Sequence, residues 1–149
     1  MFDLQTLSEQ HRAILASTDQ LLSLLRDAGP DQVAAVADCR VELSRRLHQN
    51  LLSEEEIVIA PLRRGNLTRH IACYASVATA TTDLRQQYSV HVAEWNLRAI
   101  QQNWPGYAVS VRALVGALRT VIQRKERELW PAAERTMAGA GAGVGALPA

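Results

Sequence analysis

The chain lacks several features that would narrow its function at once. Its two cysteines, Cys39 and Cys73, are too few for a disulfide framework, and both sit in apolar helical surroundings. No run of about 18 apolar residues suggests a membrane helix, although 48% of the residues are hydrophobic. The first residues also lack the basic start and apolar block of a secretory signal. We therefore expect a cytoplasmic protein with no membrane partner.

The net charge and the aromatic content do not point to a particular class of partner either. The net charge is +1 and aromatic residues make up 5% of the chain, so no global field favours an anionic polymer. Arginines gather locally, but no stacking aromatics are interleaved with them as in single-strand binders. We expect a solvated helix face and no nucleic-acid partner, with another anionic partner as the alternative. These arginines are Arg40, Arg45, Arg46, Arg63, Arg64 and Arg69.

What the chain does contain is helix-forming sequence. It is rich in Ala, Leu, Gln and Arg, and its Gly and Pro fall mainly between segments of helical periodicity. Short connections between four such segments predict an all-α, up-down-up-down antiparallel four-helix bundle over residues 1–136. The Ala/Gly-rich residues 137–149 have little to bury and are expected to form a flexible tail. The expected helices cover residues 6–27, 31–60, 67–103 (continuous, or divided near 77–83) and about 107–130.

Two segments of the chain repeat each other. Residues 51–61 and 121–131 are both amphipathic, carry charges in the middle and end in proline, at Pro61 and Pro131. Since proline cannot donate a helical hydrogen bond, the second expected helix should end or kink near residue 60. The 70-residue spacing of the prolines (131 minus 61) indicates two related helical hairpins.

Titratable residues on the inward helix stripes are the most informative ones, because a bundle core is otherwise apolar. Helical spacing places His11 and Glu55 inward and puts Lys125 within the apolar stripe of the last helix. Glu126 falls at the edge of that stripe. His91 lies on a less certain face, because a second apolar stripe competes with its own.

These residues and the two proline-terminated segments resemble the hemerythrin-like (HHE cation-binding) domain family. The resemblance spans about residues 6–133. It implies a four-helix bundle that holds two iron ions between His and carboxylate ligands. His11, Glu55, His91 and Glu126 match the metal ligands contributed by the first, second, third and fourth helices, respectively.

The same resemblance implies that the diiron centre is degenerate in this chain. Leu51 and Val121 stand where the family places the His of the second and fourth helices, and the Lys125 ammonium would repel a nearby dication. One hypothesis is that Lys125 forms a buried ion pair with Glu55 or Glu126, with His11 or His91 hydrogen-bonded to it. The alternative is that the remaining ligands hold iron or another divalent metal at low occupancy.

The sequence indicates a class of function rather than a particular reaction. The chain contains no recognisable nucleophile motif and no phosphate-binding glycine loop, so we expect a protein that is not an enzyme. The leading expectation is a regulatory or partner-binding protein that is metal-free or binds metal weakly. The alternatives are an iron-binding sensor or storage protein with a reduced His/Glu site, and a structural helical bundle that forms a homodimer. In the leading expectation, the regulatory protein would bind another protein.

Overall fold

The computed structural model describes residues 2–145, and the side chains of residues 2–141. Every regular element in this range is helical, which confirms the predicted all-α class. None of the helices within it is long and apolar enough to cross a membrane.

The first half of the chain forms two long helical segments. Helix α1 (Leu4–Asp27) begins after Asp3, whose carboxylate accepts the Thr6 amide as an N-cap. A short 3₁₀ turn, Pro30–Gln32, leads into α2 (Val33–Glu54). A π-helical turn (Glu55–Ile59) then joins α2 to α3 (Ala60–Arg64), so the second segment is helical through Arg64.

Helix α3 continues past Pro61, so the helical segment does not end near residue 60, where we expected an end or a kink. In the preceding π turn the Ala60 amide donates to the Glu55 carbonyl, five residues back. Such a wider turn makes room for a proline ring that would otherwise clash with the carbonyl four residues earlier. The second repeat behaves identically, because the Trp130 amide donates to the Lys125 carbonyl just before Pro131. The sequence repeat is therefore also a backbone repeat.

The third expected helix is divided, and at a different place from the β-branched residues 77–83. After a 3₁₀ turn (Thr68–His70), α4 runs over Tyr74–Glu94 without interruption. The break comes at Trp95 and Asn96, where Asn96 caps the short α5 (Leu97–Gln102) by accepting the Ala99 amide. The expected start at residue 67 was thus several residues too early.

The last helical segment is the longest. It comprises α6 (Trp104–Arg124), a π turn (Lys125–Leu129) and α7 (Trp130–Gly145). Residues 137–145 are therefore helical rather than an irregular tail, and Met137 packs partly buried against an apolar cluster. Residues 146–149 of the expected tail lie outside the described range.

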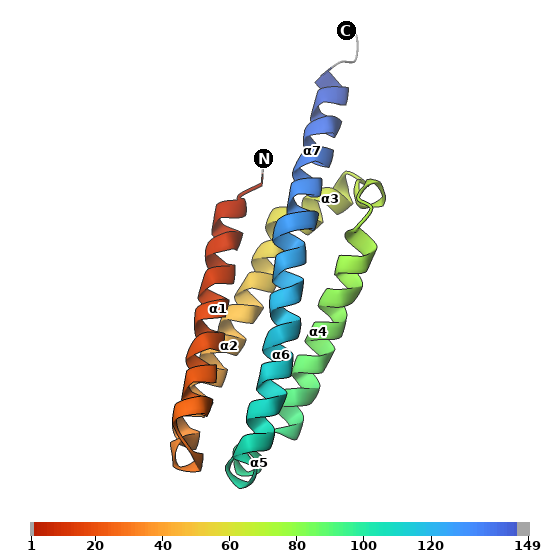
Figure 1. Ribbon diagram of the computed structural model, residues 1–149. Helices are drawn as coiled ribbons and strands as arrows, with labels where there is room; N and C mark the ends of the chain where they lie inside the picture. Colours follow the sequence, from red (N-terminus) through yellow and green to blue (C-terminus); the bar gives the residue numbers. More distant parts are fainter. Residues whose placement is uncertain (1, 146–149) are drawn as a thin grey trace.

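The long helices lie along a common axis (Figure 1). Helix α1 packs on α2 and α6, and α4 packs on α6. Apolar side chains form one cluster near α5, one near α3 and α7, and a smaller one between them. Buried polar side chains lie among these clusters, and they form the candidate site.

Candidate functional site

A buried ion pair joins α2 to the second π turn. The Lys125 ammonium donates to Glu54 Oε1 at 2.8 Å, and the Trp130 indole donates to Glu54 Oε2 at 3.2 Å. Lys125 is 4% exposed and Glu54 is 5% exposed. Both carboxylate oxygens therefore have a donor, as a buried charge requires. The structure contains the buried Lys–Glu pair expected from the sequence, but its acid is Glu54 rather than Glu55 or Glu126.

The inward orientation expected for Glu55 is wrong. The buried side of α2 passes through Leu43, Asn50 and Glu54 and reaches Val58 in the π turn. Glu55 is one residue, or about 100°, farther round the helix. Its side chain is 49% exposed and forms a surface ion pair with Arg63. Glu55 is therefore no part of the buried cluster.

His11 lies beside the ion pair, as its position on α1 predicted. It is buried, stacks on Trp130 with ring centroids 4.7 Å apart, and places Nδ1 2.9 Å from Glu126 Oε1. Burial lowers the pKa of His11, and this outweighs the opposite effect of Glu126. We therefore assign a neutral imidazole that donates its Nδ1 proton to Glu126, a rim carboxylate with 39% of its side chain exposed.

His91 belongs to a separate cluster near α5. It is buried, and its Nδ1 lies 2.8 Å from the Ser110 hydroxyl. The ring stacks on Tyr107 with centroids 5.5 Å apart. Burial, and secondarily the charge of Arg40, lower the pKa of His91. His91 therefore faces inward, which the sequence had left undecided, and its hydrogen bond goes to Ser110 rather than to the cluster around His11.

The ligands implied by the hemerythrin resemblance do not converge. Among the described side chains, no three His, Cys, Asp or Glu come close enough to hold one metal ion. His11 and Glu126 are adjacent, Glu55 faces outward, and His91 lies in the other cluster. Lys125 also places an ammonium beside His11, whose pKa its charge lowers further. The residues present therefore do not fit a diiron centre.

The sequence reasoning missed three members of the buried cluster: Glu54, Asn50 and Trp130. Asn50 donates to Gln10, which in turn donates to Ser53, so this network links α1 to α2. The spacing of Asn50, Glu54 and Val58, four residues each time, was the available signal. It was overlooked because the leucines at 47 and 51 define a neighbouring stripe.

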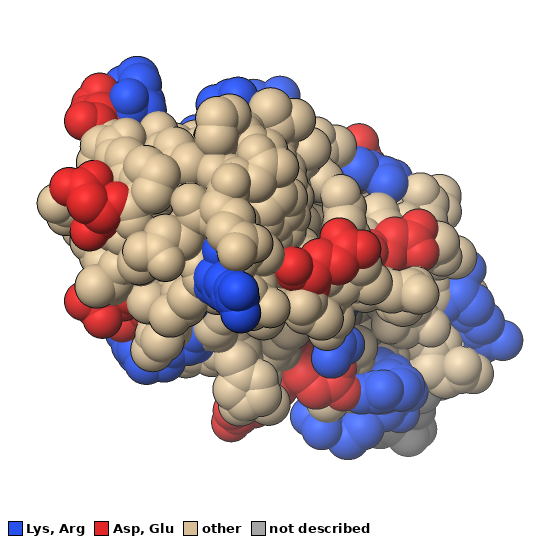
Figure 2. Space-filling view, turned by 90° about the horizontal axis from the view of Figure 1, so that it is seen from below, with Lys and Arg blue, Asp and Glu red and all other residues tan. Residues whose placement is uncertain are grey.

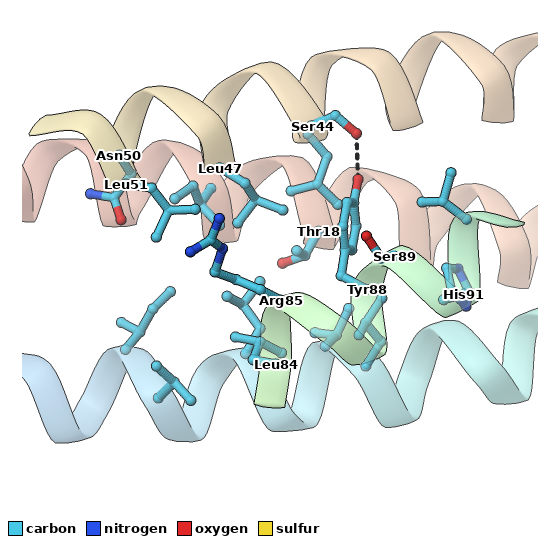
Figure 3. Close-up of a pocket in the computed structure, with 18 of the residues that line it drawn as sticks. Thr18, Ser44, Leu47, Asn50, Leu51, Leu84, Arg85, Tyr88, Ser89 and His91 are labelled. Carbon is cyan, nitrogen blue, oxygen red and sulfur yellow. Dashed lines mark hydrogen bonds between the residues drawn. The ribbon is translucent and has the colours of Figure 1, made fainter. Parts of the chain in front are cut away.

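That leucine stripe lines a pocket of about 550 Å³, whose other walls come from α1, α4 and α6. Its size falls in the usual range for small-molecule sites, about 300–1,000 Å³. Side chains of α4 line one side and those of α2 the other (Figure 3). Between Val77 and His91, α4 has no fully buried residue, and several of its side chains are short. The apolar walls include Leu43, Leu47, Val111, Leu114, Leu118 and Ile122.

The charged side chains that line this pocket are all basic. Arg40, Arg85 and Lys125 contribute, whereas no Asp or Glu is among the lining residues. Lys125 is neutralised by Glu54. Arg40, in contrast, donates to the backbone carbonyls of Trp95 at 2.6 Å and Val92 at 3.4 Å, which carry no net charge. The pocket therefore combines an apolar interior with an excess of positive charge.

The face drawn in Figure 2 shows no comparable bias. On the face in Figure 2, basic and acidic side chains are interspersed around uncharged residues. Part of the expected basic patch is neutralised locally, because Arg45 and Arg46 both bind Glu42. Such exposed pairs contribute little to stability.

Comparison of the chain with protein-family models, curated proteins and solved structures finds no match. The ion pair and the pocket are therefore the features from which a function can be inferred.

Proposed function

We propose that this protein is a hemerythrin-like, up-down-up-down four-helix bundle in which an internal ion pair has replaced the diiron centre. It is a non-enzymatic regulatory protein of the cytoplasm that acts by binding. The observation that carries this proposal is the buried Lys125–Glu54 pair, completed by the Trp130 indole. An ammonium at this position takes the place of metal charge and disfavours a dication nearby.

Two features support the relationship to the hemerythrin pattern. The first is the matched pair of π turns, Glu55–Ile59 and Lys125–Leu129, each followed by a proline. The second is His11, which is buried at the position where the resemblance places a ligand. Single π turns inside α-helices often mark functional sites. In this chain they surround an ion pair in place of a ligand set.

The pocket supports binding rather than catalysis. The surface of the pocket is mostly apolar with polar side chains set into it, which is a usual character of a small-molecule site. His11 is hydrogen-bonded to Glu126 and His91 to Ser110, and among the described residues no carboxylate is hydrogen-bonded to His91 as in a Ser-His-Asp triad. We therefore propose that a ligand in this pocket changes the regulatory state of the protein.

Elemental analysis tests the metal-independent part of the proposal. The protein would be expressed in iron-supplemented medium and purified without a chelator or a His-tag. We expect far less than one metal per chain, and the same value for a His11→Gln variant. Close to two irons per chain, lost in His11→Gln, would overturn the proposal.

A pair of matched variants tests the binding part. Leu47→Trp would fill the pocket from α2, whereas Val41→Trp places the same side chain on the outer face, where Val41 is 70% exposed. A pocket ligand should lose affinity for the first variant only. Equal affinity for both variants, with the fold intact by circular dichroism, would show that the pocket is not the binding site.

A further inference from the structure

One residue that lines the pocket carries a buried polar atom without a partner among the described residues. Tyr107 is 0% exposed and lines the pocket, and its hydroxyl makes no hydrogen bond to the described residues. The ring is held from two sides, stacked on His91 and tilted against Trp95. Buried hydroxyls are nearly always hydrogen-bonded, since leaving one unpaired is costly. The Tyr107 hydroxyl is therefore a buried donor for which the described residues supply no acceptor.

The protonation state of the Tyr107 hydroxyl determines which kind of atom can form a hydrogen bond with it. Burial raises the pKa of Tyr107 to about 12, although the charge of Arg40 acts in the opposite direction. The hydroxyl is consequently protonated at neutral pH and can donate a hydrogen bond. A donor in a buried, apolar setting is best matched by a strong acceptor, such as an oxygen that carries negative charge.

Arg40 supplies the positive charge that such an oxygen requires. Its guanidinium has five N–H donors, and the bonds to Trp95 and Val92 use only part of them. Both acceptors are backbone carbonyls, and Arg40 has no carboxylate partner in residues 2–141. Its charge acts on both Tyr107 and His91. The end of the pocket near α5 therefore holds an uncompensated cation and an unused hydroxyl.

The remainder of the pocket favours hydrocarbon. From Tyr107 the lining continues along α6 through Val111, Leu114 and Leu118, with Leu43 opposite on α2. In Figure 3, Arg85 extends from α4 across this region toward Leu47 and Leu51. Its aliphatic stem can cover an apolar ligand while its charged end stays near solvent. A ligand with a hydrocarbon body and one anionic end matches this distribution of groups.

We propose that the pocket binds a small amphipathic carboxylic acid, with its carboxylate at Arg40 and the Tyr107 hydroxyl and its hydrocarbon part along the leucine-lined walls. Arginine suits this role because its planar group can donate two parallel hydrogen bonds to a carboxylate. This inference rests on the proposed binding function and specifies its ligand class.

Isothermal titration calorimetry with three probes of equal chain length tests the ligand class. Decanoate, decanol and decylamine would each be titrated below micelle-forming concentrations at neutral pH. We expect decanoate to bind about tenfold or more tightly than decanol, as one charge-assisted hydrogen bond would provide, and decylamine not to bind. Equal affinity for decanoate and decanol would overturn the carboxylate assignment while leaving pocket binding intact. No binding of any probe would overturn both proposals.

Two substitutions test the assigned position of the carboxylate. Tyr107→Phe removes only the hydroxyl and should weaken decanoate about tenfold while leaving decanol unchanged. Arg40→Gln should remove the preference for decanoate, and Arg112→Gln, an exposed change on α6 outside the pocket, should preserve it. If Arg40→Gln fails to fold, Tyr107→Phe still decides the outcome. An unchanged decanoate affinity in Tyr107→Phe, or an equal loss in Arg112→Gln, would overturn the assignment.

Discussion

The Lys125 ammonium and the Glu54 carboxylate are 2.8 Å apart, although 71 positions separate the two residues in the chain. Lys125 is also the only lysine in the sequence, against many exposed arginines. Buried lysine is rare unless it is paired. The pair connects α2 to the last helical segment at the level of both π turns, so it should influence stability as well as metal binding.

Removal of one member of this pair should be strongly destabilising. In Lys125→Met, Glu54 keeps only the Trp130 indole as a donor, so we expect a loss of about 3–5 kcal/mol in the free energy of unfolding. Urea unfolding followed by circular dichroism measures this loss. The control is Arg127→Met in the same π turn, which is exposed and should change stability by about 0.5 kcal/mol or less. A double variant, Glu54→Leu with Lys125→Met, should be more stable than Lys125→Met alone.

The burial of Lys125 also predicts its chemical reactivity. An amine-reactive reagent should leave the Lys125 peptide unmodified in the native protein, because the ammonium is 4% exposed and bonded to Glu54. Mass spectrometry of the digested protein measures the extent of modification. The same reagent should label Lys125 fully in urea-unfolded protein. Equal labelling rates in the two states would contradict the buried position.

Tyr107→Phe should stabilise the protein in the absence of ligand. The substitution removes a buried hydroxyl that has no hydrogen-bond partner in the described part of the chain, so we expect a gain of about 1 kcal/mol. Tyr88→Phe is the matched control, because the Tyr88 hydroxyl does have a partner, Ser44. Thermal unfolding should therefore move to higher temperature in the first variant only. A lower melting temperature for Tyr107→Phe would mean that its hydroxyl is satisfied in solution.

Stability should fall as the pH drops below neutral. Burial lowers the pKa of both His11 and His91 in the folded state relative to the ordinary value of 6.5. Below that value the unfolded chain binds more protons than the folded one, so acid favours unfolding. The stabilisation is complete above about pH 6.5 and is lost progressively toward the lowered pKa of each histidine.

Urea unfolding at several pH values measures this dependence. His91→Gln should reduce the slope of stability against pH as the pH falls below about 6.5, because one of the two neutral buried histidines is gone. His70→Gln, at an exposed position, should leave the slope unchanged. A slope that is insensitive to His91 would contradict the neutral, buried state assigned to it.

Several elements could be read from residue order, because they depend on local periodicity. The apolar spacing of the helices, the inward position of His11 and the location of Lys125 in an apolar stripe all follow from 3.6 residues per turn. The paired proline segments were visible as well. The end or kink expected near residue 60 was left open, since periodicity gives no indication that a π turn will accommodate the proline ring.

The helix boundaries depended on packing to a greater extent. The segment before α4 has helix-compatible residues from position 67, but a 3₁₀ turn there brings Ile71 into the apolar cluster near α3 and α7. Likewise, residues 137–145 are helical although their glycine content argued for a tail. The first turns of α7 supply the helical nucleus from which these residues continue, and Met137 adds an apolar contact.

The sequence by itself determined the all-helical class, the internal repeat and the presence of one inward lysine. Only the tertiary structure decided that Glu54, rather than Glu55, faces that lysine, because one residue turns a side chain by about 100° and helix rotation is set by packing. It also decided that α4 packs on α6 and that side chains of α1, α2, α4 and α6 enclose a pocket. Local periodicity describes a single helix, whereas partners and cavities depend on how helices far apart in the chain meet.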